Sequence, residues 1–121
     1  MLNDRLKSFL YAWNGILAMF RAEPNAKIHL LAAIVAIGAG FWFDIERSEW
    51  CAVVLAIFCV FAAEAFNTSI EELTNLVSPE PHPLAGKAKD LAAAGVLFTA
   101  IGAVIVGFII FLPRILSLYG Q

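Results

Sequence analysis

Three long apolar stretches restrict what this 121-residue chain can fold into. They run from Ile28 to Phe43, from Trp50 to Ala63 and from Leu91 to Leu112. A helix that crosses a bilayer needs about 20 apolar residues, within a range of about 17–25. The third stretch is long enough alone, and the first two are long enough once their flanking residues are included. Because backbone groups in lipid must be hydrogen-bonded internally, and because the stretches are too long for barrel strands, each is expected to be a helix. The pattern predicts an all-α membrane protein with spans at about 27–44, 49–67 (extended beyond the membrane to about 77) and 90–112.

The composition supports a membrane location for one small domain that covers residues 1–121. With 61% hydrophobic and 15% charged residues, the chain carries more apolar side chains than a soluble core of this size can bury. The net charge of -2, without a basic patch that alternates with aromatic residues, argues against a nucleic-acid partner. Cys51 and Cys59 lie in one apolar stretch, which favours packed core residues over a disulfide.

The segment before the first span predicts an amphipathic helix at the membrane surface, over residues 4–21. Its polar interruptions are not typical of a signal peptide. Its apolar residues recur at spacings of three and four and therefore share one helix face: Leu6, Phe9, Leu10, Trp13, Ile16, Leu17 and Phe20.

The basic residues predict how the chain is oriented in the membrane. Connectors are expected at 44–49 and, longer and rich in proline, at 75–88. Of the eight Lys and Arg residues, six would lie on one side of the membrane, namely Arg5, Lys7, Arg21, Lys27, Lys87 and Lys89. Because cytoplasmic segments carry the excess of basic residues, the N-terminus is expected in the cytoplasm and the C-terminus outside.

A polar face on the second span is the best candidate for a functional site. Glu64, Asn67, Thr68, Glu71 and Asn75 follow helical spacing and share one face. Glu64 lies about 21 Å along the helix from Trp50, which places it just inside the inner edge of the hydrocarbon. An ionisable residue at that depth is costly and is therefore a candidate functional residue, although an interfacial side chain reaching for water is the alternative.

The remaining charged candidates are Glu23, Lys89 and Asp90, each at the end of a predicted span. Lys89 could equally be a positive-inside anchor, and Glu23 a carboxylate at a helix start. His29 and His82 have no second histidine or cysteine at ligand spacing, which argues against zinc. Carboxylates and substrate phosphates together bind Mg²⁺, and phosphoryl transfer also needs a base and a cation on the phosphates. These residue types fit ATP-dependent phosphorylation of a lipid hydroxyl, although the sequence contains neither GxxxxGK[ST] nor a kinase glycine loop.

Two ungapped motifs carry a resemblance to a known family. They are AEAFNTSIE from Ala63 to Glu71 and HPLAGKAKDLAAA from His82 to Ala94. Together with similarity from Ser8 to Pro113, they resemble the prokaryotic diacylglycerol kinase family, which includes the undecaprenol kinases. The resemblance implies a homotrimer of three-span subunits in the bacterial inner membrane. It also implies active sites shared between neighbouring subunits at the cytoplasmic interface.

The resemblance also implies roles for single residues. Glu64 matches the proton acceptor, Asn67 matches an essential polar residue near it, and Glu23 and Glu71 match the ligands of the Mg²⁺ that accompanies ATP. The positions that match nucleotide contacts are Arg5, Tyr11, Glu23, Glu71, Lys89 and Asp90. In one departure, Asn75 stands where the family usually has aspartate.

The sequence is compatible with two lipid substrates and with two other classes of protein. The segments Lys27–Leu30, His82–Leu84 and Leu112–Arg114 look more like undecaprenol kinases, so undecaprenol is expected, with diacylglycerol as the alternative. A small ion-coupled transporter would need its carboxylate near the midplane, whereas Glu64 is predicted near one edge. A purely structural subunit would leave the acidic face unexplained. It would explain the glycines of the spans as sites of close helix packing, namely Gly38, Gly40, Gly102 and Gly107.

Overall fold

The computed structural model describes residues 1–120, which form four helices. In chain order they are α1 (Leu2–Ala22), α2 (Pro24–Trp42), α3 (Arg47–Val77) and α4 (Pro83–Tyr119). Helices α2, α3 and α4 are each long and apolar enough to cross a membrane. The prediction of an all-α fold with three spans and one preceding helix is therefore confirmed.

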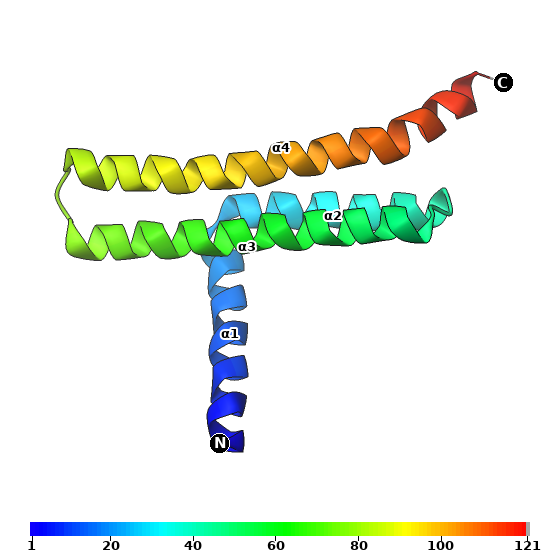
Figure 1. The fold of residues 1–121 in the computed structure, drawn as a ribbon. Helices are drawn as coiled ribbons and strands as arrows, with labels where there is room; N and C mark the ends of the chain where they lie inside the picture. Colours follow the sequence, from blue (N-terminus) through cyan, green and yellow to red (C-terminus); the bar gives the residue numbers. More distant parts are fainter. Residues whose placement is uncertain (121) are drawn as a thin grey trace.

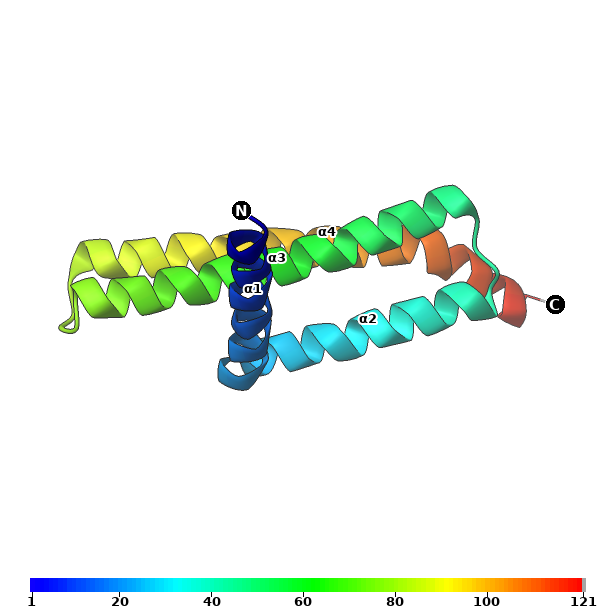
Figure 2. The same cartoon turned by 90° about the horizontal axis from the view of Figure 1, so that it is seen from below.

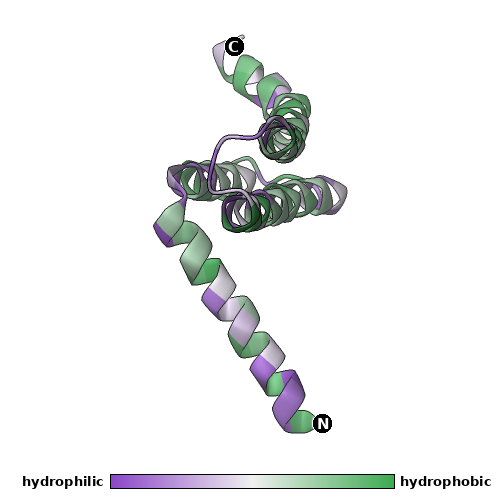
Figure 3. Cartoon of the chain, turned by 90° about the vertical axis from the view of Figure 1, so that its left-hand side faces the viewer, coloured by the Kyte–Doolittle hydropathy of each residue, from purple (hydrophilic) through white to green (hydrophobic). Residues whose placement is uncertain are grey.

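Helix α1 lies across the direction of the other three helices and meets them at its C-terminal end (Figure 1). There Met19 is buried, and the ring of Phe20 packs against that of Phe61 with centroids 5.6 Å apart. Hydrophilic and hydrophobic residues alternate along α1 (Figure 3), and its apolar Phe9 and Trp13 are exposed. Helix α2 begins at Pro24. Proline has no backbone N–H, which costs nothing here because an N–H at the first helical position would have no partner within the helix.

Helices α3 and α4 form a long antiparallel hairpin and run side by side (Figures 1 and 2). At 1.5 Å per residue their 31 and 37 residues span about 46 Å and about 55 Å, more than the roughly 30 Å of the hydrocarbon core. The closed end of the hairpin extends past α1 (Figure 1).

The connector is shorter than the predicted 75–88: α3 ends at Val77, in agreement with the predicted extension to about 77, but α4 already begins at Pro83 and not near residue 90. The prolines that indicated a loop include the one that begins the helix. His82 caps α4, since its Nδ1 accepts a hydrogen bond of 3.1 Å from the Leu84 N–H. Lys89 and Asp90 therefore stand inside the first turns of α4 and not just before it.

The other end of the bundle holds the turn from α2 to α3 and the C-terminal part of α4. Asp44 takes the left-handed conformation at φ 49°, and Glu46 and Glu49 form a capping box at the start of α3. Arg114 of α4 donates two hydrogen bonds of 2.8 Å to the Glu49 carboxylate. The indole of Trp50 lies over Gly40, where an added Cβ would come within 2.6 Å of a ring carbon.

Few side chains are buried within the chain. One buried cluster joins Ile45, Val53 and Ile110, while most apolar side chains of the spans are exposed. Cys51 and Cys59 are among the exposed residues, so the expectation that they pack in the core was wrong for this chain. Apolar side chains on a membrane helix need no protein core, because lipid solvates them as well as a core does.

Candidate active site

Glu64 is the most deeply buried charged side chain, with 1% exposure. Neither of its carboxylate oxygens has a hydrogen-bond partner within the described chain, and the same holds for Oδ1 of Asn67, one turn away on α3. Buried polar groups are nearly always hydrogen-bonded, so an unsatisfied pair in one place indicates a functional site. The sequence prediction that Glu64 and Asn67 belong together agrees with this geometry.

His29 of α2 faces Glu64 from across the helix interface, with Nε2 3.2 Å from Oε1 of the carboxylate. The two atoms are close, but they are not aligned as a regular hydrogen bond. The sequence analysis considered His29 as a zinc ligand and as part of the segment Lys27–Leu30, and it missed this contact. The available signal was that His29 is the one polar residue in an otherwise apolar stretch.

Two more carboxylates lie close to Glu64. Asn67 donates from Nδ2 to Oε1 of Glu71 at 3.2 Å, which orients Glu71 on the same face of α3. Glu23 reaches this face from the junction of α1 and α2. Burial raises the pKa of Glu23, the negative charges of Glu71 and then Glu64 raise it further, and Thr68 opposes the rise. The structure therefore places Glu23 near Glu71 and Glu64, an arrangement that the family resemblance implied, and the roles of the three residues stay predictions.

Glu23 and Glu71 suit a divalent cation that also binds phosphate. Within residues 1–120 there is no group of three or more His, Cys, Asp or Glu side chains arranged to hold a metal ion. Mg²⁺ is commonly bound by one or two carboxylates together with substrate phosphates and needs no complete protein cage. Burial raises the pKa of Glu23 most, and the negative charges of Glu71 and Glu64 add to the rise; a bound cation would offset this part of the effect.

The other four predicted nucleotide contacts lie on α4 and on the first half of α1. Lys89 of α4 donates to Oδ1 of Asn75 on α3, near the closed end of the hairpin, and Asp90 beside it is exposed. Arg5 and Tyr11 are exposed on the first half of α1, the part that extends away from the other helices (Figure 1). Lys89 thus contacts α3 one turn beyond Glu71, whereas Arg5 and Tyr11 lie on the part of α1 that extends away; the contacts of all four residues with nucleotide stay predictions.

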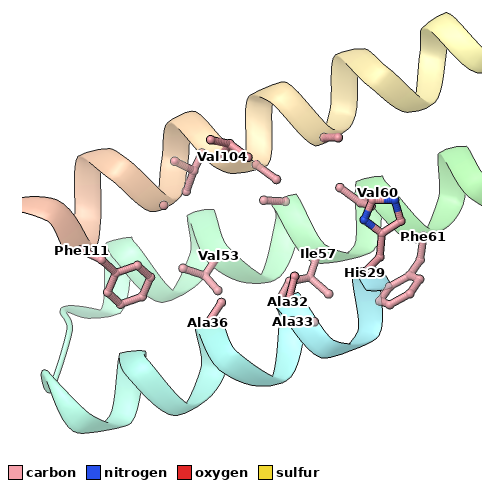
Figure 4. A pocket seen from close by; sticks show the side chains of 15 residues that line it. His29, Ala32, Ala33, Ala36, Val53, Ile57, Val60, Phe61, Val104 and Phe111 are labelled. Carbon is pink, nitrogen blue, oxygen red and sulfur yellow. The ribbon is translucent and has the colours of Figure 1, made fainter. Parts of the chain in front are cut away.

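An apolar cavity of about 230 Å³ lies between α2, α3 and α4 (Figure 4). His29 stands at the end nearer Glu64, and Phe111 stands at the other end. The rest of the lining is small or branched and apolar, and includes Ala33, Val60 and Gly107. An imidazole therefore lines one end of a space suited to hydrocarbon and contacts a buried carboxylate.

The model of the prokaryotic diacylglycerol kinase family matches residues 10–111 of the chain. The chain belongs to this family. The match includes every candidate site residue except Arg5. As a member of this family the protein is an integral membrane lipid kinase, which transfers a phosphoryl group from ATP to a lipid with the help of a divalent metal ion.

Individual relatives carry two different substrate names. An undecaprenol kinase from Bacillus subtilis (strain 168) is 39% identical over 114 residues, covering 94% of this chain and 93% of that protein. A diacylglycerol kinase from Synechocystis sp. is also 39% identical over 114 residues, covering 93% of this chain and 65% of that protein. A diacylglycerol kinase from Escherichia coli (strain K12) is 29% identical over 100 residues, covering 83% and 82%.

Proposed function

We propose that this lipid kinase phosphorylates undecaprenol to undecaprenyl phosphate. The observation that carries the proposal is the buried, unsatisfied carboxylate of Glu64 in contact with His29, which lines one end of an apolar cavity. Among the described residues, His29 is the one polar side chain that lines this cavity. Undecaprenol is apolar except for its hydroxyl, whereas diacylglycerol carries two ester groups that would lack donors there. Diacylglycerol is the second candidate, because a diacylglycerol kinase is as similar in sequence as the undecaprenol kinase is.

The proposed mechanism places the hydrocarbon chain in the cavity and the hydroxyl beside Glu64. Glu64 accepts the hydroxyl proton while the oxygen forms a bond to the γ-phosphorus of ATP and the bond to the ADP oxygen breaks. Glu71 follows seven residues later on the same face, about 10 Å along the helix. This separation lets the phosphates enter in line with the hydroxyl. They approach from the aqueous side, where Glu71 lies, whereas the lipid chain stays within the membrane.

Mg²⁺ is the metal that we propose for this site, with Glu23 and Glu71 as its ligands. When bound, the ion supplies positive charge against the phosphate oxygens. Asn67 holds Glu71 in place through its Nδ2 hydrogen bond. Lys89 and Asp90, together with Arg5 and Tyr11, are the proposed contacts to the nucleotide. The closed end of the hairpin extends past α1 (Figure 1), and Lys89 in the first turns of α4 belongs to that end, which supports this proposal.

We also propose a homotrimer in the bacterial inner membrane, with the N-terminus in the cytoplasm and the C-terminus outside. The excess of Lys and Arg on the N-terminal side supports the orientation. The exposed apolar surface of α2, α3 and α4 leaves room for neighbouring subunits. A shared site would allow nucleotide contacts that one chain does not bring together to come from two subunits.

Glu64→Gln tests the proposal. It keeps the size of the side chain but removes the base, so turnover of undecaprenol with ATP should fall roughly 10²–10⁴-fold, the usual scale for general acid–base catalysis. The matched control is Glu72→Gln, which makes the same change at an exposed position of α3 and should keep wild-type turnover. Near wild-type turnover by Glu64→Gln would show that Glu64 is not the base. Wild-type protein that accepts diacylglycerol but not undecaprenol would establish the second candidate.

A further inference from the structure

We propose that His29 positions the Glu64 carboxylate for proton transfer, by binding Oε1 and leaving Oε2 to the lipid hydroxyl. The inference rests on the proposed function and adds a residue from a second helix to its site. Glu64 belongs to α3 and His29 to α2, so their relative position is set by the packing of two membrane helices. No contact along α3 itself can replace this one, because the Glu64 oxygens have no other partner in the described chain.

The distance and the burial of the two side chains carry the argument. Nε2 of His29 is 3.2 Å from Oε1 of Glu64, with side-chain exposures of 21% and 1%. A small rotation of the imidazole would align its Nε2–H with the carboxylate, since a neutral histidine can donate from one ring nitrogen. An imidazole in an apolar helix stretch is costly unless it has a polar partner, and Glu64 is that partner.

The position of His29, nearer to Oε1, would leave Oε2 of Glu64 for the lipid hydroxyl. His29 lines one end of the apolar cavity (Figure 4), and its Nε2 lies 3.2 Å from Oε1 of Glu64. A hydroxyl arriving from the cavity meets the carboxylate beside the imidazole. With Oε1 held by His29, the hydroxyl proton passes to Oε2 and the imidazole keeps its own proton throughout. Rates respond to such placement, because a misplacement of 1 Å can cost about 10²-fold.

The test compares His29→Leu, which cannot donate, with His29→Gln, whose amide N–H can. His29→Leu should lower kcat for undecaprenol by about 10–10²-fold, and His29→Gln should recover most of that loss. The KM for ATP should stay unchanged in both variants, because His29 lies on the lipid side of Glu64. The matched control is His82→Asn, which changes the second histidine at an exposed helix cap where asparagine can also accept the capping bond.

A cycle with Glu64→Gln separates positioning from a purely structural role. If His29 acts through Glu64, His29→Leu should cause little further loss once the carboxylate is gone. A structural role would instead lower kcat and thermal stability equally in both backgrounds. If His29→Leu fails to assemble, the folded His29→Gln variant decides: kcat within about tenfold of wild type supports the inference, and kcat as low as that of Glu64→Gln overturns it.

The failure of this inference can be distinguished from the failure of the proposed function. Wild-type protein that phosphorylates neither undecaprenol nor diacylglycerol would refute the proposed function. Active wild-type protein whose kcat is unchanged in His29→Leu would refute the role of His29 alone. Equal losses in His29→Leu and His29→Gln, with normal assembly, would also overturn it.

Discussion

At the scale of single residues, the negative charges of Glu23, Glu64 and Glu71 dominate the site. Burial is the main cause of the raised pKa of Glu23, and the two neighbouring carboxylates add to it. The folded chain therefore retains a proton at pH values where the unfolded chain has released it. Stability falls as the pH rises from the usual value of 4.5 through the raised pKa of the folded state.

Glu23→Gln should remove this pH-dependent loss. In metal-free detergent solution at pH 7, the variant should melt at a higher temperature than wild type, and the difference should vanish below pH 4.5, where both side chains are neutral. Mg²⁺ should raise the Tm of wild type, and the concentration needed should increase at least about tenfold in the variant. Melting curves recorded with a chelator and then with added Mg²⁺ measure both effects.

Glu80→Gln is the matched control for this prediction, because Glu80 is exposed in the connector between α3 and α4. It should leave both the pH dependence and the response to Mg²⁺ unchanged. If Glu23→Gln responds to Mg²⁺ as wild type does, Glu23 is not a metal ligand.

At the scale of helices, polar contacts join α3 to α4 near both ends of the hairpin. Lys89 donates to Asn75 near the closed end, and Arg114 binds Glu49 at the other. Arg114 also donates to the carbonyl of Ile110 at 2.7 Å, beside Pro113, which lies inside α4. Such paired contacts set the register of the two helices. They therefore help to fix how far α4 is shifted along α3, and thus which part of α4 lies level with Glu64.

Arg114→Gln should lower the Tm slightly and leave the turnover of folded protein unchanged. The bidentate pair is lost, but it is partly exposed, so its contribution to stability is small. Turnover is preserved because the pair lies at the opposite end of α3 from Glu71. Melting and kinetic measurements of Arg114→Gln, Glu49→Gln and the double variant test this. A strong fall in kcat with normal assembly would show that the register of the hairpin reaches the active site.

At the scale of the whole molecule, the chain leaves most of its apolar surface for other partners to cover. Lipid or neighbouring subunits must cover the exposed faces of α2, α3 and α4. The cavity between these three helices has an apolar lining that suits hydrocarbon. Gly107 lines that cavity, and an added Cβ there would meet no atom within 4 Å. A larger side chain at Gly107 would therefore occupy the cavity without a clash at its Cβ.

Gly107→Leu should hinder the lipid chain while leaving the nucleotide unaffected. The KM for undecaprenol should rise about tenfold or more, with the KM for ATP unchanged. Gly102→Leu is the matched control, since Gly102 is exposed on α4, does not line the cavity and also has free space around it. An unchanged KM for undecaprenol would place the lipid chain elsewhere. A change of oligomeric state in Gly107→Leu alone, seen by sedimentation, would make that face of α4 a subunit interface.

Local patterns in the sequence were enough to predict the three spans, the preceding helix and the face of α3 that carries Glu64, Asn67 and Glu71. These features depend on apolar length and on the 3.6-residue period, which act within one helix. The prediction of a connector that continues to residue 88 was wrong, also for a local reason. Proline marks either a loop or the first turn of a helix, and the spacing of prolines does not distinguish the two.

Contacts between helices were decided by the tertiary structure alone. Local sequence patterns do not indicate that His29 would face Glu64, that Arg114 would bind Glu49, or that Lys89 would pair with Asn75. Each of these contacts joins side chains from two helices, and it depends on how the helices rotate and slide against each other. The resemblance to a family implied that Glu23 would meet Glu71, but the raised pKa of Glu23, caused first by burial and then by the charges of Glu71 and Glu64, arises from the packing of the α1–α2 junction on α3.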